Sequence, residues 1–397
     1  MEYRAVEDEH EDAYYALTRY AFNPTAGPAI NDFDENDIAR ATLPAHRGIF
    51  EDGELKSVCG HIWFDGLVRG EYYSVPGLTF VATPPEHRRS GYVAKLMECS
   101  LSEYRERGDL LSILWPFKYR FYRRLGWEAC SSSVTYSCDP SALSFARDEL
   151  GADGSFQRVE ADEFDRLTPV YDTYASEYGL SIARSADWWR YHIFESWDAE
   201  RYVYTWEKDG DVRAYLAYTI QGEWSERTLH VVDLATRDLE GLLAILTFLS
   251  NHDSQVATVR FRLPTDIHLL DLVTEPEEVT ATMDTGAMAR IVDVTQTLPT
   301  LCEMNVDAAL TVAVADPLVD WNNGTFDLSV SSSNAKCTPS NNDAGVTLDI
   351  GHLTQLAVGY RSAGELSEIG KLDGSPTIIE TMDQLFPAEQ TYLGTGF

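Results

Sequence analysis

The sequence is poor in basic residues. Its 397 residues include 31 Lys and Arg against 64 Asp and Glu, which gives a formal net charge of −33. Proteins that bind nucleic acids or anionic membranes present clustered Lys and Arg to the phosphates, so this balance argues against both kinds of partner. No apolar run approaches the roughly 18 residues of a membrane-spanning helix. The first residues lack the basic and apolar segments of a secretion signal, and we therefore expect a cytoplasmic protein.

Cysteine is also scarce, and no two cysteines are spaced as a Cys-x-x-Cys pair. This excludes zinc ribbons and thioredoxin-type redox sites. We expect free thiols, as in a reducing compartment, and no bound metal. The six cysteines are Cys59, Cys99, Cys130, Cys138, Cys302 and Cys337.

The chain is long enough for two or three domains, since a domain averages roughly 150 residues. Residues 1–150 and 151–290 each mix strand and helix patterns, and the order of elements in the second region repeats that of the first. Residues 291–397 differ in composition, with 14 Asp and Glu against 3 Lys and Arg. The pattern predicts an α/β (α+β) protein with a separate C-terminal α+β domain.

Apolar periodicity predicts the individual elements. Helices are expected at 13–22, 93–107, 162–178, 187–194, 239–250 and 352–360. Strands are expected at 55–64, 77–82, 110–114, 201–206, 212–220, 228–235, 256–263, 310–315, 325–330 and 344–350.

One segment runs against the acidic background. Residues 86–124 hold nine Lys or Arg and five acidic residues, where even spacing would give about three basic ones. Within this segment, a strand ending near Ala82 is followed by a short turn and then by a helix. Unpaired amides and the helix dipole at such a turn bind anions, and Gly91 allows close approach of the backbone. The segment therefore predicts a pyrophosphate site, although it matches neither the Walker loop nor GxGxxG.

This segment resembles the acetyl-CoA loop of GNAT-type N-acetyltransferases, since Arg88-x-x-Gly91 follows a strand that carries Val81 and Thr83. Val93 stands where the usual pattern has Gly or Ala. Other motifs resemble the enhanced-intracellular-survival (Eis) family. They are Leu114-Trp115-Pro116-Phe117, residues 121–128, Arg184-Ser185-x-x-Trp188, residues 288–293, Leu385-Phe386-Pro387 and the terminal aromatic Phe397.

The resemblance implies three domains and a homo-oligomer, which is hexameric in the family. They are an N-terminal GNAT domain (1–150), a degenerate second GNAT domain (151–290) and a sterol-carrier-protein-like (SCP2-like) domain (291–397). Each GNAT domain would be a mixed sheet flanked by helices. Where the second domain would need a cofactor loop it has Asp238 and Glu240 and no Gly. Because these carboxylates would repel a pyrophosphate, we expect one acetyl-CoA per chain.

The resemblance also implies how acetyl-CoA is held. The backbone at Val81 and Thr83 would bind the pantetheine arm. The pyrophosphate would be bound by the following loop, that is by Arg88, Arg89, Ser90 and Gly91.

Two residues would carry the chemistry by the same resemblance. Tyr122 would be the general acid that protonates the departing thiolate, and the α-carboxylate of Phe397 would be the base. An acidic chain is expected to line its substrate pocket with carboxylates. We therefore expect an amine of a polycationic small molecule, such as a polyamine or an aminoglycoside, as acceptor.

Other interpretations remain open. The third domain could make the chain a non-catalytic carrier or binding protein for apolar ligands, or the chain could be a structural component of an oligomer. Alternatively, the enzyme could acetylate lysine side chains or N-termini of proteins. Acetyl-CoA binding tests the carrier alternative, and a counterscreen of peptides against small polyamines tests the alternative substrate.

Overall fold

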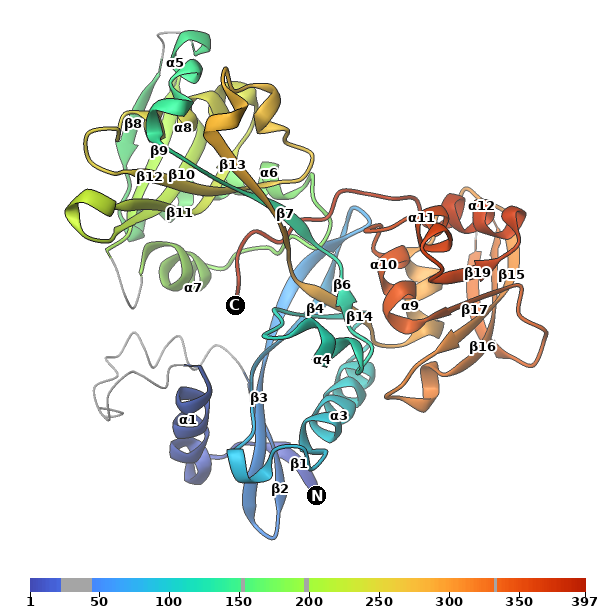
Figure 1. The fold of residues 1–397 in the computed structure, drawn as a ribbon. Helices are drawn as coiled ribbons and strands as arrows, with labels where there is room; N and C mark the ends of the chain where they lie inside the picture. The colour runs from blue at the N-terminus through green and yellow to red at the C-terminus, as the bar shows by residue number, and fades with distance from the viewer. Residues whose placement is uncertain (23–44, 151–153, 196–199, 332–333) are drawn as a thin grey trace. The chain divides into compact units, whose positions relative to one another are not determined.

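Three β-sheets, divided between two units, make up the fold in the computed structural model, which describes residues 1–22, 45–150, 154–195, 200–331 and 334–397 (Figure 1). The first unit comprises residues 1–130, 287–391 and 397, and the second comprises residues 131–286 and 392–396. The chain therefore leaves the first unit twice and returns to it twice, the last time at its final residue.

The first unit contains a seven-stranded mixed sheet with the strand order β1-β2-β3-β4-β5-β14-β6. Its strands are β1 (Glu2–Ala5), β2 (Ala45–Glu51), β3 (Glu54–Val68), β4 (Glu71–Ala82), β5 (Leu111–Leu114), β6 (Glu128–Ala129) and β14 (Met288–Ile291). Only β4 and β5 pair in parallel. The associated helices are α1 (Asp8–Phe22), α3 (Tyr92–Arg107) and α4 (Tyr119–Arg123).

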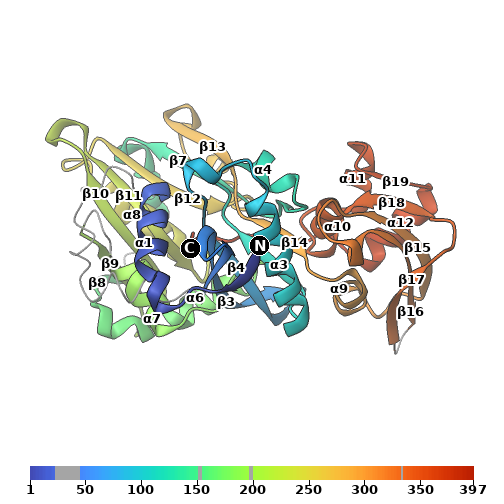
Figure 2. The same cartoon turned by 90° about the horizontal axis from the view of Figure 1, so that it is seen from below.

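Helices α1 and α3 cover opposite faces of this sheet, as Figures 1 and 2 show on either side of β3 and β4. On one face, Tyr14 of α1 packs in a cluster with Val58. On the other face, Leu96 of α3 packs in a cluster with Cys59 and Leu78. Adjacent residues of a strand point to opposite faces, so Val58 and Cys59 mark the α1 face and the α3 face of the sheet.

The first unit also contains a five-stranded sheet with the order β17-β16-β15-β18-β19. Its strands are β15 (Ala308–Ala315), β16 (Gly324–Ser331), β17 (Asn334–Ser340), β18 (Val346–Asp349) and β19 (Leu372–Gly374), and its helices are α9 (Val294–Leu301), α10 (Ile350–Ala357), α11 (Ala363–Glu368) and α12 (Pro376–Leu385).

Arg290 of β14 ties these two sheets together. Its side chain is fully buried. Its Nη2 donates to Asp316 Oδ2 at 2.5 Å, its Nη1 donates to the carbonyl of Leu125, and the guanidinium lies 5.1 Å from the centre of the Trp127 ring. A buried charge is tolerated only with such partners. The segment 288–293, which the sequence singled out, is therefore the joint between the two sheets of this unit.

The second unit has one seven-stranded sheet with the order β13-β7-β12-β11-β10-β9-β8. Its strands are β7 (Ser132–Cys138), β8 (Ser155–Arg158), β9 (Tyr202–Lys208), β10 (Asp211–Gln221), β11 (Thr228–Thr236), β12 (Thr258–Pro264) and β13 (Val279–Thr285), and its α-helices are α5 (Phe145–Glu149), α6 (Thr168–Ala175), α7 (Ala186–Trp188) and α8 (Leu239–Ser250). Its design repeats that of the first sheet, because antiparallel strands lead through α8 to the parallel strand β12.

The predicted fold class, with mixed sheets flanked by helices and a C-terminal α+β domain, is confirmed. Several elements differ from expectation. The helix expected at 162–178 is divided into a 3₁₀ segment, Ala161–Arg166, and α6, with Pro169 in the first turn of α6. The helix expected at 187–194 becomes a π-helical turn after Trp188. Further 3₁₀ turns lie at Pro85–His87, Pro140–Leu143, Trp224–Glu226, Leu269–Asp271, Pro276–Glu278 and Asp320–Asn322.

The domain limits also differ from the expected ones at 150 and 290. Strand β7 lies before residue 150 and yet belongs to the sheet of the second unit, whereas β14 lies before residue 291 and yet completes the sheet of the first. Neither strand was predicted from the sequence, and periodicity does not reveal which sheet a strand joins, because partner strands are distant in the sequence. No helix among the described residues is long and apolar enough to cross a membrane. All six cysteines are free.

Replacing Arg290 by Met should lower the free energy of unfolding by about 3–5 kcal/mol, because Asp316 would remain as an uncompensated buried charge. Equilibrium denaturation with urea measures the loss. Arg361→Met is the control, since Arg361 forms an exposed ion pair with Glu365 at 3.1 Å and should cost less than about 1 kcal/mol. Equal losses in the two variants would contradict the structural role of Arg290.

Candidate active site

Strands β4 and β5 of the first sheet pair over a short stretch and then diverge, and we call this place the parting of β4 and β5. They pair only at Gly77 with Ile113 and at Leu78 with Leu114. Strand β5 ends at Leu114, whereas β4 continues to Ala82. The backbone groups of β4 beyond Leu78 therefore have no β5 partner, and they can hydrogen bond an extended ligand in strand-like fashion.

A β-bulge accompanies the parting. The register between β3 and β4 shifts near Phe80, whose φ is 51°. A left-handed backbone is rare for a residue with a side chain, and bulges bend and twist the strand that carries them. The bulge re-aims the last residues of β4, Val81 and Ala82.

The segment after β4 is a short turn that leads into α3. Gly91 is the N-cap of α3, with φ 86°, and no side chain caps the helix. The first turn contains no acidic residue. Its amides have no partner inside the helix, and they point outward at the positive end of the helix dipole. A Cβ added at Gly91 would meet nothing within 4 Å, so this glycine borders open space.

A cavity of about 1060 Å³ joins these features. It is bordered by the end of β4, the turn, the first residues of α3, the end of α1 and residues around α4. Most of the residues predicted to hold the cofactor line it, namely Val81, Thr83, Arg88, Arg89 and Gly91. Ser90 is exposed and is not among the lining residues. The sequence did not single out Tyr20, which lines the cavity from α1.

Thr83 and Arg88 are held in place at the mouth of the turn. The hydroxyls of Thr83 and Ser57 lie 2.9 Å apart, and Arg88 Nε donates to the carbonyl of Thr83 at 3.2 Å. The contact bends Arg88 back over the end of β4. Both residues can therefore bind a ligand without first losing much conformational freedom.

Tyr122 lies in α4 and is buried, with 3% of its surface exposed. It packs in the cluster with Leu78 and Leu114, the last pair before the strands part. Its ring also contacts Phe117 and Phe121, at 5.3 and 5.1 Å between centres. Burial raises the pKa of Tyr122 well above its usual value, so the phenol keeps its proton.

Phe397 contacts β3 and β4 on the other face of the sheet. Its ring lies 4.9 Å from the ring of Phe64 and covers Gly77, where a Cβ would stand 2.7 Å from Phe397 Cε2. The hydroxyl of Thr79 donates to a terminal oxygen of Phe397 at 3.4 Å. Gly77 and Thr79 alternate with Leu78 along β4. The terminal carboxylate therefore lies on the face opposite to Tyr122, and both flank the parting of β4 and β5.

The second unit repeats the parting without the anion site. Strand β11 pairs in parallel with β12 only from Thr228 to His230, and both strands then continue separately. Asp238 caps the next helix, since its Oδ1 accepts from the amide of Gly241 at 2.9 Å. A carboxylate thus occupies the place that a phosphate would need.

The tail that ends in Phe397 is fixed inside the second unit. The amide of Tyr392 donates to the carbonyl of Gly179 at 3.0 Å, and the amide of Leu393 donates to Ser131 Oγ at 3.2 Å. Arg184 Nη2 lies 3.5 Å from Thr395 Oγ1. These contacts hold the segment from Tyr392 to Thr395 within the second unit.

The Arg184 side chain lies in a polar cluster and is 2% exposed. Its two terminal nitrogens donate to the carboxylate of Asp233 at 2.7 and 2.9 Å, and the guanidinium lies 3.6 Å from the centre of the Tyr171 ring. The hydroxyl of Tyr215 donates to Asp233 as well, at 2.7 Å. The sequence marked Arg184 only by family resemblance, and Asp233 carried no sequence signal.

Comparison with known families agrees with this geometry. Residues 2–130 and residues 180–291 each match a family described as an acetyltransferase (GNAT) domain, and residues 294–394 match a sterol carrier protein domain. Uncharacterized N-acetyltransferases are among the relatives. The one from Streptomyces griseus is 26% identical over 373 residues, covering 88% of each chain, and the one from Streptomyces coelicolor is 25% identical over 391 residues, covering 93% of this chain and 92% of the relative.

Solved structures share the fold over the full chain. A probable N-acyltransferase from Enterococcus faecalis aligns with a TM-score of 0.87 at 22% identity, covering 100% of this chain and 99% of that one. A GCN5-related N-acetyltransferase from Anabaena variabilis gives a TM-score of 0.85 at 22% identity, covering 100% of both chains. Eis1 from Mycobacterium abscessus gives 0.77 at 24% identity, also covering 100% of both chains.

The family matches and the shared fold together confirm the resemblance found in the sequence. The chain belongs to the GNAT acetyltransferases, which use acetyl-CoA, and it has the Eis-like organisation of two GNAT domains followed by a sterol carrier protein domain.

Proposed function

We propose that the chain transfers the acetyl group of acetyl-CoA directly to an amine of a polycationic small molecule, with Tyr122 as general acid and the α-carboxylate of Phe397 as base. One observation carries this proposal: Tyr122 and Phe397 flank the parting of β4 and β5 from opposite faces of the sheet. A reactant held between the two strands would have a proton donor on one side and a proton acceptor on the other.

The donor site is proposed to follow the cavity of the first unit. The free edge of β4 at Val81 and Thr83 would bind the pantetheine arm, and the uncapped start of α3 would bind the pyrophosphate. Arg88 and Arg89 would add charged hydrogen bonds. The equivalent helix α8 is capped by Asp238, which supports one donor site per chain.

Acetyl-CoA supplies an acetyl thioester, and in the transfer a C–N bond forms while the C–S bond breaks. Tyr122 would give its proton to the departing sulfur. A thiol ordinarily titrates near 8.5 and a phenol near 10, so this transfer requires the phenol to be held close to the sulfur. Ring contacts with Phe117 and Phe121 and burial in the hydrophobic cluster restrict the motion of the phenol.

Phe397 would remove the proton of the attacking amine. An α-carboxylate is ionised at neutral pH, so it attracts an ammonium group and takes up its proton directly or through one water. The contacts of its ring with Phe64 and Gly77 fix the carboxylate at β4. The net charge of −33 favours the approach of polycations over long distances.

Tyr122→Phe should lower kcat by roughly 10²–10⁴-fold, the usual contribution of a general acid, and leave the Kd of acetyl-CoA unchanged. Steady-state thiol release and calorimetry measure the two quantities. Tyr119→Phe, on the same helix, is the matched control and should keep kcat. Because burial raises the pKa of Tyr122, wild-type activity should not fall near pH 10, where a free phenol ionises. A kcat for Tyr122→Phe within twofold of wild type would exclude the acid role.

Adding two glycines after Phe397 should abolish most turnover. The extension moves the carboxylate by about 7 Å along the chain, out of reach of a bound amine. We expect kcat to fall by at least about 100-fold with acetyl-CoA binding retained. Phe397→Leu keeps the carboxylate and loses only aromatic contact, so it should retain more activity than the extended chain. Equal turnover by the extended and unextended chains would remove Phe397 from the mechanism.

Gly91→Ala should raise the KM for acetyl-CoA by about tenfold or more, because the methyl group would project into the anion site and the left-handed φ would be strained. Gly108→Ala is the control at the other end of α3. It has a φ of 81° and the same open surroundings, so it should cost similar stability and leave KM unchanged. The two variants are compared by thermal unfolding and acetyl-CoA saturation curves. An equal rise of KM in both would argue against the anion site.

A further inference from the structure

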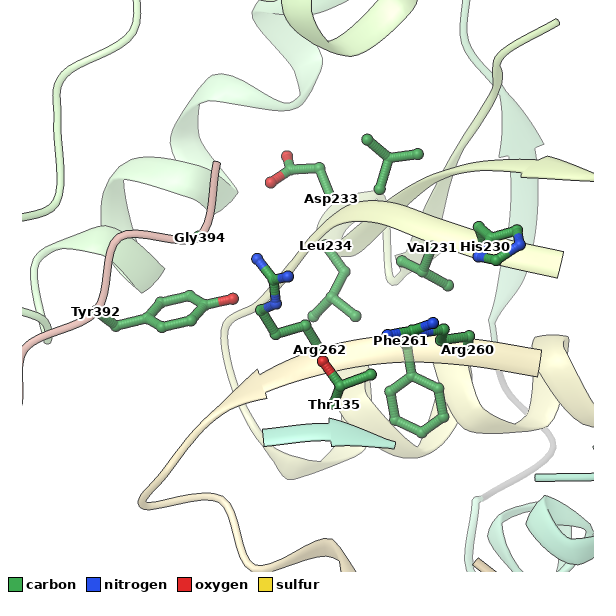
Figure 3. Close-up of a pocket in the computed structure, with 11 residues that line it drawn as sticks. Thr135, His230, Val231, Asp233, Leu234, Arg260, Phe261, Arg262, Tyr392 and Gly394 are labelled. Atoms are coloured by element: carbon green, nitrogen blue, oxygen red, sulfur yellow. The ribbon is translucent and has the colours of Figure 1, made fainter. Parts of the chain in front are cut away.

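The second unit has a cavity of its own, with a volume of about 280 Å³. It lies where β11 and β12 part, and Thr135, His230, Arg260, Arg262, Tyr392 and Gly394 contribute to its lining. Figure 3 shows the tail with Tyr392 and Gly394 on one side and the strands that carry the other residues beside it. Neither the acetyl-CoA site nor the proposed acid and base draw on these side chains.

The cavity lies over strands β11 and β12 of the second sheet, on the face that also carries helix α6. Helix α6 packs against this face over β10 and β11, where it buries Tyr215 and Ala217. Strand β12 directs Val259 and Phe261 into the core on the other face, so Arg260 and Arg262 share the face with the cavity. The register places Arg260 beside His230 and Arg262 beside Thr135.

The lining is positively charged in a strongly acidic chain. Neither Arg260 nor Arg262 forms an ion pair with any residue in the described ranges, and Nε of Arg262 is buried without a hydrogen-bond partner. Asp233 also borders the cavity, but its carboxylate already accepts hydrogen bonds from Arg184 and Tyr215. Two guanidinium charges therefore remain without an acidic partner among the described residues.

Uncharged donors complete the lining. Thr135 contributes a hydroxyl. Burial and the nearby Arg260 lower the pKa of His230, which leaves its ring neutral at neutral pH and able to donate one N–H. The Tyr392 phenol faces the Arg262 guanidinium in Figure 3. Two guanidinium groups with neighbouring N–H and O–H donors form the kind of site that binds an oxyanion.

We infer that the second GNAT domain binds a small oxyanion, a phosphate or carboxylate group, between Arg260, Arg262 and the tail at Tyr392–Gly394. The volume fits this class, since a water molecule occupies about 30 Å³ and the cavity thus has room for one small organic anion. A polycation would be repelled here, so the anion is a ligand distinct from the proposed acceptor.

A bound anion would also stabilise the C-terminal tail. Gly394 lines the cavity and lies three residues before Phe397 in the chain. An anion held between β12 and the tail would stabilise the ordered tail, since a ligand that binds one conformation shifts the population toward it. Occupancy would therefore slow hydrogen exchange of the amides between Tyr392 and Gly396.

The test is calorimetric titration of the full chain with inorganic phosphate and, separately, with malonate, at constant ionic strength. The protein is first saturated with coenzyme A, so that the pyrophosphate turn of the first unit cannot respond. We expect saturable binding of one anion per chain by at least one probe. Phosphate binding alone would identify a phosphate ligand, and malonate binding alone a carboxylate ligand.

Arg260→Gln and Arg262→Gln should each weaken this binding by about tenfold or more. Arg237→Gln removes one exposed positive charge from the same unit, outside the cavity lining, and should change the affinity by less than about twofold. Hydrogen exchange of the tail should slow on binding in wild type and in Arg237→Gln only. Absence of saturable binding by both probes, or an equal loss in Arg237→Gln, would overturn the inference, and neither result depends on acetyl transfer.

Discussion

The parting of β4 and β5 is the constraint on which the active site depends. Each strand residue brings one N–H and one C=O that must find partners, and β5 stops supplying them after Leu114. The rest of the site is built around this open edge. The bulge at Phe80 turns the strand end, the α3 amides face the following turn, and Tyr122 and Phe397 lie on the two faces.

The two GNAT domains differ at the start of the helix that connects the two parallel strands. In both sheets two parallel strands diverge, and a helix connects these two strands in the sequence. In the first domain the helix begins at Gly91 without a cap. In the second, Asp238 caps the helix and also pairs with Arg213. A carboxylate that caps a helix occupies amides that an uncapped helix leaves free for an anion.

Local patterns predicted part of the fold. The apolar spacing of 93–107 predicted α3, and the apolar run near 110–114 predicted β5, because both are written in consecutive residues. Strands β7, β14 and β17 and helix α9 are among the elements that were not predicted, since strand partners and tertiary burial are not encoded in short windows. The buried partners of Arg290 likewise lie far away in the sequence.

For the candidate site, the sequence was most informative in the turn from Val81 to Gly91, where backbone chemistry follows from residue order. It also identified Tyr122 and Phe397, although only through family resemblance. It gave no sign of Thr79, which contacts the terminal carboxylate, or of Asp233, which holds Arg184 beneath the tail. Such residues act through contacts between distant segments, and only the folded chain reveals them.

The most direct test of the account is acetyl transfer to spermine by the unmodified chain, with free thiol and acceptor mass followed in the same reaction. We expect saturable turnover in which each thiol released is matched by one acetyl group on a spermine nitrogen. Binding of acetyl-CoA without transfer to spermine, or thiol release without an acetylated amine, would contradict it.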